Sequence, residues 1–222
     1  HDYDKVAALS SSIEVAPLVA ALLIARGYET EDDARRFLSP TMEQLNDPHL
    51  LKGMDAALER IRKAIANDEK ILIWGDYDVD GTTGTTLLRK ALISLGARTS
   101  YHIPNRFTEG YGLNIDYLAK AKADGVGLVI TVDCGVRAFD PLIWARDNGL
   151  DVIVTDHHLS DPERGVPPAV AVVNPNQEGC TYPDKQLAGV GVALKIAQAL
   201  IGDGGHAEQR EAVEDMCQRL GI

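Results

Sequence analysis

The apolar positions of this chain follow two different rhythms, and the change comes near residue 70. Before that point, apolar residues recur at helical spacing in three stretches, EVAPLVAALLIARGY, TEDDARRFLSP and MDAALERIRKAIAND. Thr30 precedes a turn rich in acids and is a predicted helix N-cap, and Pro40 follows the end of the same helix. Residues 14–66 are therefore predicted to be helical.

From residue 70 onward, short apolar runs alternate with helical stretches. The runs are KILIWG, RTSYHIP, GLVITVD, DVIVTD and AVAVVNP. Unbroken runs of strand-forming residues between helices are typical of strands that are buried on both faces, as in a parallel sheet. The pattern predicts an α/β fold, in which a parallel sheet of about five strands is flanked by helices and preceded by an N-terminal helical extension.

Acidic residues and histidines follow three of these predicted strands, in the stretches ILIWGDYDVDG, LVITVDCG and DVIVTDHH. A single aspartate after a strand is usually a helix cap or a turn residue. Parallel sheets, however, place their ligand sites at the carboxyl ends of the strands. The repeated pattern therefore predicts one shared site at this edge of the sheet, where the following residues converge: Asp78, Asp80, Asp133, Asp156, His157 and His158.

This set of side chains points to a particular chemistry. Carboxylates with an imidazole suit hard or borderline divalent cations such as Mn²⁺ or Mg²⁺. Two such ions about 3.5–4 Å apart form the usual site for hydrolysing a phosphate ester, because they activate a water and stabilise charge on the phosphate oxygens. A second histidine can contact the phosphate or protonate the leaving oxygen. The cluster thus predicts a two-metal phosphoesterase.

The composition of the chain limits which substrates and which cellular compartment suit this chemistry. The chain has 222 residues and a net charge of −11, which argues weakly against a strong nonspecific binder of duplex DNA. Two bound divalent cations would offset about four negative charges locally. The three cysteines lack C-x-x-C spacing and indicate reduced thiols in a cytoplasm, with Cys134 as a small buried hydrophobe. Neither a membrane span nor a signal peptide is predicted.

The motifs of other enzyme classes fit the sequence less well than this interpretation does. The stretch GDYDVDGTTGTT follows a predicted strand and opens a helix, as phosphate loops do. The chain nevertheless has no G-x-x-x-x-G-K-[ST], no G-x-G-x-x-G and no G-x-S-x-G. The glycines of GVGVALK at 189–195 favour close helix packing.

The motifs D-Y-D-x-D-G-x-T-G, V-D-C-G and T-D-H-H-L, in this order, resemble those of the DHH phosphoesterases. Three further stretches narrow the resemblance to the bacterial exonucleases of this family, which degrade single-stranded DNA from the 5′ end: LLIARGYETEDDARRFLSP, IPNRFTEGYGLN and VVNPNQEGCTYPDKQLAGVGVALK. The resemblance implies a cytoplasmic enzyme of DNA repair and recombination. Its implied partners are single-stranded DNA with a free 5′ end, a single-strand-binding protein and a helicase, without a membrane.

The resemblance also implies roles for individual residues. Asp78 and Asp133 would bind one metal ion, and Asp80, Asp133 and His157 the other, with Asp133 as the bridge. Asp76 would support one of the ions, Asp156 would orient an imidazole, and His158 would face the scissile phosphate. Arg106 matches an arginine that holds a substrate phosphate near the 5′ end, and a surface salt bridge is the alternative role for it.

The sequence departs from the family pattern in two places. Some relatives have a metal-binding histidine where this chain has Trp74. The family's fourth motif, an aspartate in an apolar stretch, is not found, and neither Asp203 nor Asp215 has that context. We therefore expect the N-terminal catalytic lobe of a longer enzyme or a natural short relative. The expected domains are a helical extension at 1–68, a DHH domain at 69–202 and a helical segment at 203–222.

Two other functions stay open at this point. The first is a phosphoesterase for small substrates, such as oligoribonucleotides, cyclic dinucleotides or pyrophosphate, as in other branches of the superfamily. The second is a DHH scaffold without catalysis, which the intact motifs argue against.

Overall fold

The computed structural model describes residues 2–203 and 207–220, and the predicted segment 203–222 therefore lies partly outside the described residues. The chain divides into two compact units, His1–Asn46 and Asp47–Ile222. Among the described helices, none is by itself long and apolar enough to cross a membrane, and only α1 and α2, bent by 112°, pass that test as a pair.

The first unit is a small helical cluster. It consists of α1 (Tyr3–Ser12), α2 (Pro17–Ala25), α3 (Glu31–Leu38) and the 3₁₀ turn η1 (Met42–Gln44). Thr30 caps α3 as predicted, because its side chain accepts the backbone N–H of Asp33 at 3.1 Å. The helices share a small apolar core, formed by Val6, Leu9, Ile13, Ala20, Leu23 and Ala34.

The second unit contains a five-stranded sheet in the order β2-β1-β3-β4-β5. Its strands are β1 (Lys70–Gly75), β2 (Arg98–His102), β3 (Val126–Val132), β4 (Asp151–Thr155) and β5 (Ala171–Val173). Every neighbouring pair is parallel, which confirms the predicted α/β fold. After β1, the chain forms β2 on one side of β1, and β3 then lies on the other side of β1. The strand order therefore reverses between β1 and β3. Open parallel sheets bind their ligands at such a point.

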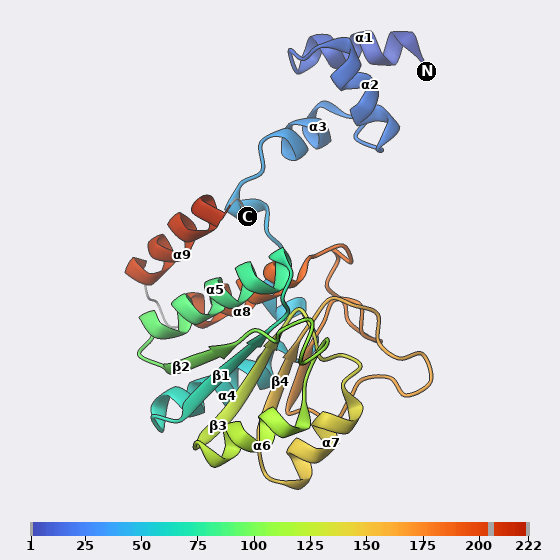
Figure 1. Ribbon diagram of the computed structural model, residues 1–222. Coiled ribbons are helices and arrows are strands. Elements are labelled where there is room, and N and C mark those ends of the chain that lie inside the picture. Colours follow the sequence, from blue (N-terminus) through green and yellow to red (C-terminus); the bar gives the residue numbers. More distant parts are fainter. Residues whose placement is uncertain (1, 204–206, 221–222) are drawn as a thin grey trace. The chain divides into compact units, whose positions relative to one another are not determined.

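Helices cover both faces of this sheet (Figure 1). The helices of this unit are α4 (Met54–Ala66), α5 (Val79–Ser94), α6 (Ile115–Ala123), α7 (Phe139–Asp147), α8 (Gly189–Asp203) and α9 (Ala207–Leu220), with a short turn η2 (Pro48–Leu50) before them. Helices α4, α5 and α8 share one buried core with the sheet, and α6 and α7 share the other.

The residues of β1 illustrate this division. Ile71 and Ile73 belong to the core on the side of α4, α5 and α8, whereas Leu72 and Trp74 belong to the core on the side of α6 and α7. Successive side chains of a strand point to opposite faces, so an apolar run without polar interruption is buried on both. This is the physical reason why the unbroken apolar runs predicted the sheet.

Candidate functional site

The three predicted ligand-bearing segments meet at the carboxyl edge of the sheet, on β1, β3 and β4. Each segment begins with an aspartate whose backbone N–H donates to the last residue of the neighbouring strand. The pairs are Asp76 with Val132 at 3.2 Å, Asp133 with Thr155 at 3.0 Å, and Asp156 with Val173 at 3.1 Å. The hydrogen-bond ladder of the sheet therefore continues one residue past the strands and fixes the backbone of all three aspartates.

Asp76 and Asp78 follow β1. The side chain of Asp76 is buried, and its Oδ1 has no hydrogen-bond partner among the described residues. Burial raises the pKa of Asp76 above its usual value. Asp78 caps α5, because its Oδ1 accepts the backbone N–H of Gly81 at 2.9 Å. A Cβ on Gly81 would lie 2.6 Å from the backbone of Asp76, so glycine is required for α5 to begin this close to β1.

Asp133 is almost completely buried, with an exposed fraction of 1%, as is Asp156. Its backbone has a φ of +63°, in the left-handed region that residues other than glycine adopt rarely. The Nε2 atom of His157 lies 3.1 Å from Oδ1 of Asp133, but no described group makes a well-oriented hydrogen bond to that oxygen. Burial, together with the charges of Asp80 and Asp78, raises the pKa of Asp133 to about 8. A nearby cation would relieve this cost.

Asp156 has its hydrogen-bonding capacity filled by its own neighbourhood. Its carboxylate accepts the backbone N–H groups of Val136, His157 and His158, and the Nδ1 atom of His158 lies 2.7 Å from Oδ1. Burial acts to raise the pKa of Asp156, but the hydrogen bonds from His158 and Val136 outweigh it and hold the pKa below its usual value. The hydrogen bond to Asp156 raises the pKa of His158 to about 9.

Asp80 has a role that the sequence did not reveal. Its two carboxylate oxygens accept the backbone N–H groups of Gly189 and Val190 at 2.7 and 2.6 Å, at the N-terminus of α8. A carboxylate in this position stabilises the positive end of the helix. The same carboxylate lies 3.5 Å from Nε2 of His157. A Cβ on Gly189 would lie 2.7 Å from Oδ1 of Asp133, which explains why a glycine begins this helix.

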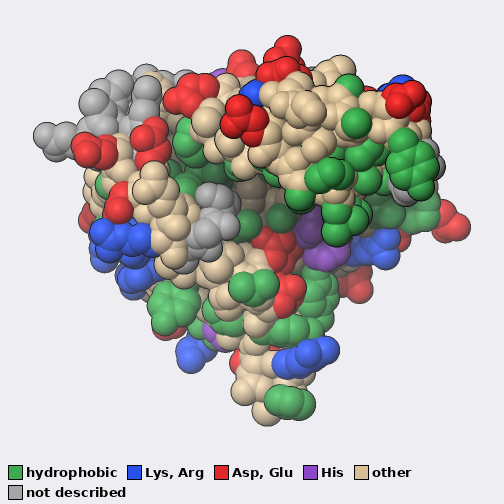
Figure 2. All heavy atoms as spheres, turned by 90° about the horizontal axis from the view of Figure 1, so that it is seen from above, with side chains coloured by type: hydrophobic (Ala, Val, Ile, Leu, Met, Phe, Trp, Pro, Cys, Tyr) green, Lys and Arg blue, Asp and Glu red, His purple; other side chains and the backbone are tan. Residues whose placement is uncertain are grey.

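The side chains form two groups that could each hold a cation. One consists of Asp133, His157 and His158, and the other of Asp76, Asp78 and Asp133, with the ligand atoms of each group within 4.8 Å of one another. Asp133 belongs to both groups. Seen from above, histidine side chains reach the surface beside acidic ones, with hydrophobic and basic side chains close by (Figure 2).

Arg106 lies in the loop between β2 and α6, and it borders the same cavity as Asp76, Asp78 and His158. Its guanidinium carbon is 5.2 Å from the centre of the Tyr77 ring, and it forms no ion pair with a described residue. The absence of such a pair disfavours the surface salt bridge that the sequence left open.

Two tyrosines that sequence reasoning did not select, Tyr77 and Tyr111, border the cavity. Tyr77 lies between Asp76 and Asp78, and the hydroxyl of Tyr111 donates to the backbone oxygen of Asp133 at 3.4 Å. The Tyr111 ring also meets the His158 ring edge to face, with centroids 6.4 Å apart. Tyr77 interrupts the aspartates of the first motif, and Tyr111 lies in the stretch IPNRFTEGYGLN that carried the family resemblance, but neither signal pointed to a place at the site.

Trp74 stands where the resemblance implies a histidine in some relatives. Its side chain is wholly buried in the core on the side of α6 and α7, where its ring lies 5.0 Å from Tyr117 and 4.6 Å from His102. The indole therefore packs against aromatic neighbours.

Residues 70–220 match the DHH family, N-terminal domain. The single-stranded-DNA-specific exonuclease RecJ of Bacillus subtilis is 48% identical over 202 residues, which cover 91% of this chain and 25% of the relative. RecJ of Haemophilus influenzae is 40% identical over 193 residues, covering 86% of this chain and 32% of the relative. The solved structure of RecJ from Thermus thermophilus in complex with Mn²⁺ has a TM-score of 0.70 at 30% identity, over 91% of this chain and 28% of that chain.

The chain thus spans a quarter to a third of the length of the relatives it matches. The family match, in contrast, covers most of the second unit and well over half of the whole chain. On this evidence, together with the motifs and the parallel sheet, the chain belongs to the DHH family.

Proposed function

We propose that this chain hydrolyses phosphodiester bonds of single-stranded DNA, from the 5′ end, with two divalent cations, Mn²⁺ or Mg²⁺. The observation that carries the proposal is Asp133, a buried carboxylate with an unpartnered oxygen that belongs to both candidate cation groups. The names of the relatives support the substrate, since the first two are single-stranded-DNA-specific exonucleases.

The donor set fits hard or borderline divalent cations. It offers carboxylate oxygens and imidazole nitrogens, and the described residues bring no thiolate into either group. The orphaned Oδ1 atoms of Asp76 and Asp133 both lack a protein partner among the described residues. The residues proposed to hold the ions are Asp78, Asp80, Asp133 and His157, with Asp76 in support. When bound, such ions supply an activated water and positive charge for the phosphate oxygens.

The remaining residues have roles of their own. Asp156 holds the imidazole of His158 through Nδ1, which leaves Nε2 directed away from this bond. With its pKa raised to about 9 by Asp156, His158 carries a proton at neutral pH in the metal-free chain, and it can donate this proton to a phosphate or leaving oxygen. Arg106 would hold a substrate phosphate, because its guanidinium has no carboxylate partner among the described residues and can bind an oxyanion in two places.

The wider setting is part of the same proposal. Residues 69–202 would carry the catalytic machinery, residues 1–68 would extend it, and 203–222 would continue from it. The enzyme would act in the cytoplasm during DNA repair and recombination, on strands that a helicase separates and a single-strand-binding protein covers.

The test is a comparison of substrates in the presence of Mn²⁺. The chain is expected to release mononucleotides from 5′-phosphorylated single-stranded DNA, and the Asp133→Asn variant is expected to release none. The Asp116→Asn variant, on α6, is a matched control and should behave like the original chain. Faster turnover of pyrophosphate or short RNA would favour the small-substrate phosphoesterase, and failure to bind Mn²⁺ would favour the scaffold.

A further inference from the structure

The strand β2 forms one outer edge of the sheet (Figure 1). It pairs with β1 in a regular register, from Arg98 beside Lys70 to His102 beside Trp74. Among the described residues, no other strand pairs with β2, and no backbone-to-backbone hydrogen bond outside this ladder involves residues 98–102. Such an edge presents a row of N–H and C=O groups with which another extended chain can pair.

Natural proteins usually protect a sheet edge with a proline, a bulge or a covering segment. The strand β2 contains no proline, and its register against β1 shows no shift. Its side chains are also accessible, since Tyr101 is 58% exposed and both Arg98 and Ser100 are exposed. The hydroxyl oxygen of Thr99 is buried but has no hydrogen-bond partner among the described residues. The edge therefore offers polar groups that the described chain does not use.

A groove of about 600 Å³ follows this edge, between β2 and α6. Lys70, Arg98 and Lys120 border it, together with one acid, Asp124. Arg98 pairs with Asp68 at 2.9 Å, but both side chains are more than half exposed, and such a pair contributes little. Lys120 forms no ion pair with a described residue. The groove is thus positively charged.

Cations lie on both faces of the edge. Tyr101 is in register with Ile73 and shares its face of the sheet, on which α5 packs. There the guanidinium carbon of Arg89, on α5, lies 5.4 Å from the centre of the Tyr101 ring. Successive side chains of a strand alternate, so Arg98 points to the opposite face, where Lys120 lies on α6. A strand that pairs with β2 would meet cations on each of its two faces.

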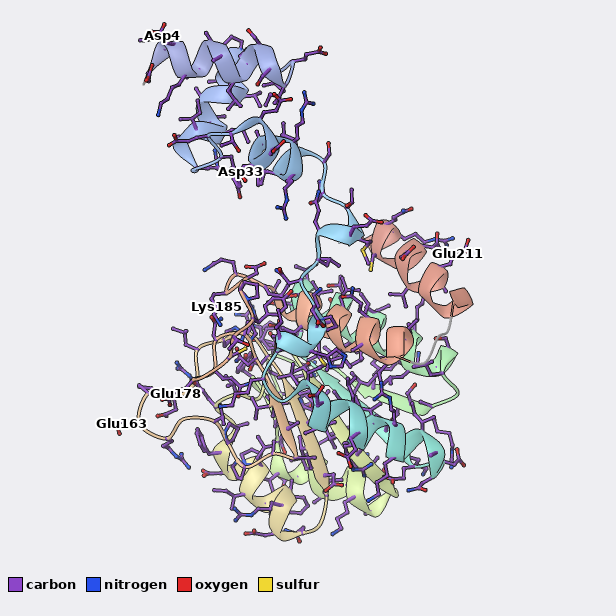
Figure 3. The ribbon with its side chains drawn as sticks, turned by 180° about the vertical axis from the view of Figure 1, so that it is seen from behind. Asp4, Asp33, Glu163, Glu178, Lys185 and Glu211 are labelled. Carbon is purple, nitrogen blue, oxygen red and sulfur yellow. The ribbon has the colours of Figure 1, made fainter. Side chains whose placement is uncertain are left out.

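This local charge differs from that of the chain as a whole, which has 33 acidic and 22 basic residues. In the view from behind, the acidic side chains of Glu163 and Glu178 lie on loops at the far side of the second unit from β2 (Figure 3). Two copies of β2 would bring like charges together, which opposes pairing of the edge with itself. The edge is complementary to an acidic chain.

We propose that the edge of β2 binds an extended, acidic segment of a partner protein, which joins the sheet as an additional strand. Main-chain hydrogen bonds hold the segment, and its acidic side chains meet Arg98 and Lys120 on one face and Arg89 on the other. A DNA strand is a poorer match, because its backbone cannot pair with alternating N–H and C=O groups.

The position of the groove separates this binding from the carboxylate cluster. Lys70 and Val126, which border the groove, are the first residues of β1 and β3. The carboxylates follow the opposite, carboxyl ends of the same strands. A partner on β2 therefore leaves the candidate cation groups open, and the inference does not rest on the proposed hydrolysis.

The first test is an NMR titration of the metal-free chain with a capped peptide of two Val-Glu-Glu repeats, at low salt. Binding should shift the backbone amides of residues 98–102 and slow their exchange with deuterium. The same peptide with alternate amides methylated should bind at least tenfold more weakly, because it cannot complete the ladder. A peptide of two Val-Lys-Lys repeats should not bind, since its charge has the same sign as the groove.

The second test removes the cations one at a time. Lys120→Gln and Arg89→Gln should each weaken binding of the acidic peptide about two- to fivefold, the range for exposed ion pairs. Lys122→Gln is the matched control, because this lysine is exposed on the same helix and does not border the groove. Since Arg89→Gln also removes a contact with Tyr101, Lys120→Gln is the decisive variant.

Three results would overturn the inference. The first is equal affinity of the Lys120→Gln and Lys122→Gln variants for the acidic peptide. The second is equal binding of the methylated and unmethylated peptides, which would mean that the main chain of the partner does not pair with β2. The third is tighter binding of a thymidine hexanucleotide than of the acidic peptide at residues 98–102, which would assign the groove to nucleic acid.

Discussion

Asp133 combines a left-handed backbone conformation, burial and a raised pKa. Different substitutions at this position separate the effects of these properties. Alanine removes the carboxylate and leaves a β-carbon in a conformation that favours glycine. Asparagine tolerates this conformation, and it has nearly the same shape as aspartate. Comparison of the two variants therefore distinguishes loss of charge from strain in the backbone.

We expect Asp133→Ala and Asp133→Asn to lose binding at both cation sites, because one carboxylate belongs to both groups. Calorimetric titration with Mn²⁺ measures the number of ions bound. An unaltered stoichiometry and affinity in either variant would contradict the assignment of Asp133 as the shared ligand.

The raised pKa of Asp133 predicts a dependence of stability on pH in the metal-free chain. Folding raises this pKa from the ordinary 3.8 to about 8, so between these pH values the carboxyl ionises in the unfolded chain but stays protonated in the folded one, which costs stability that asparagine does not lose. The free energy of unfolding should thus favour Asp133→Asn most above pH 8. The difference should shrink as the pH falls through 8 and vanish near 4. Urea unfolding at a series of pH values, with a chelator present, measures it, and a difference independent of pH would refute the cause.

The two neighbouring histidines should differ in their effects. His158→Ala is expected to lower turnover more than Mn²⁺ affinity, because its imidazole is held by Asp156 for a role towards the phosphate. His157→Ala should do the reverse, since its Nε2 lies 3.1 Å from Asp133. Calorimetry and steady-state kinetics on both variants give the two quantities. Equal losses of affinity would remove the distinction between them.

The positions of these acids could be predicted because each follows an apolar strand, and parallel strands end at one edge of the sheet. The left-handed φ of Asp133 and the bonds of Asp80 to α8 could not be predicted from the sequence. The bonds of Asp80 depend on where a helix 109 residues further along the chain begins, which no local pattern contains.

At the scale of the element, too, some features follow from local sequence patterns and others do not. The sheet follows from runs that are apolar on both faces, whereas β2 is an edge strand with mostly exposed or half-exposed residues. The loop after it was selected only by its resemblance to relatives. In the structure, Glu109 holds this loop by accepting the N–H of Asn105 at 3.1 Å and contacting Nε2 of His102 at 2.7 Å. These bonds lie in a loop outside the helices and strands, so the periodicity of apolar residues did not predict them.

The start of α8 leads to a prediction about a glycine. Gly189→Ala would place a Cβ 2.7 Å from Oδ1 of Asp133, so either the helix or the carboxylate must move. We expect Mn²⁺ affinity to fall at least tenfold in a folded protein. Gly202→Ala, in the same helix with no atom within 4 Å of the added Cβ, is the control and should leave affinity unchanged. Equal affinities in the two variants would show that the close approach has no effect on the site.

At the scale of the whole molecule, net charge and length limit what the chain does alone. A net charge of −11 offers little attraction to DNA, so binding should be weak and sensitive to salt. The chain also spans only 25% of its Bacillus subtilis relative. Substrate positioning can lower a barrier by about 7–11 kcal/mol at the extreme, and a longer enzyme has more surface with which to achieve it.

We therefore expect this chain to bind Mn²⁺ but to degrade 5′-phosphorylated single-stranded DNA slowly and distributively. Under the same conditions, the full-length Bacillus subtilis relative should be faster by orders of magnitude. Product-length analysis over time, at increasing salt, compares the two proteins. Rapid processive digestion by this chain alone would show that its 222 residues suffice.

The ladder that runs one residue past the strands has a consequence for the thermodynamics of the site. The backbone amides of Asp76, Asp133 and Asp156 are bonded within the sheet, so they should exchange with deuterium only when the sheet itself opens. Folding then fixes the ligand backbone before any cation arrives, and ion binding carries no further entropy cost of ordering it. The site is preorganised, and its occupancy should strengthen the fold without reshaping it.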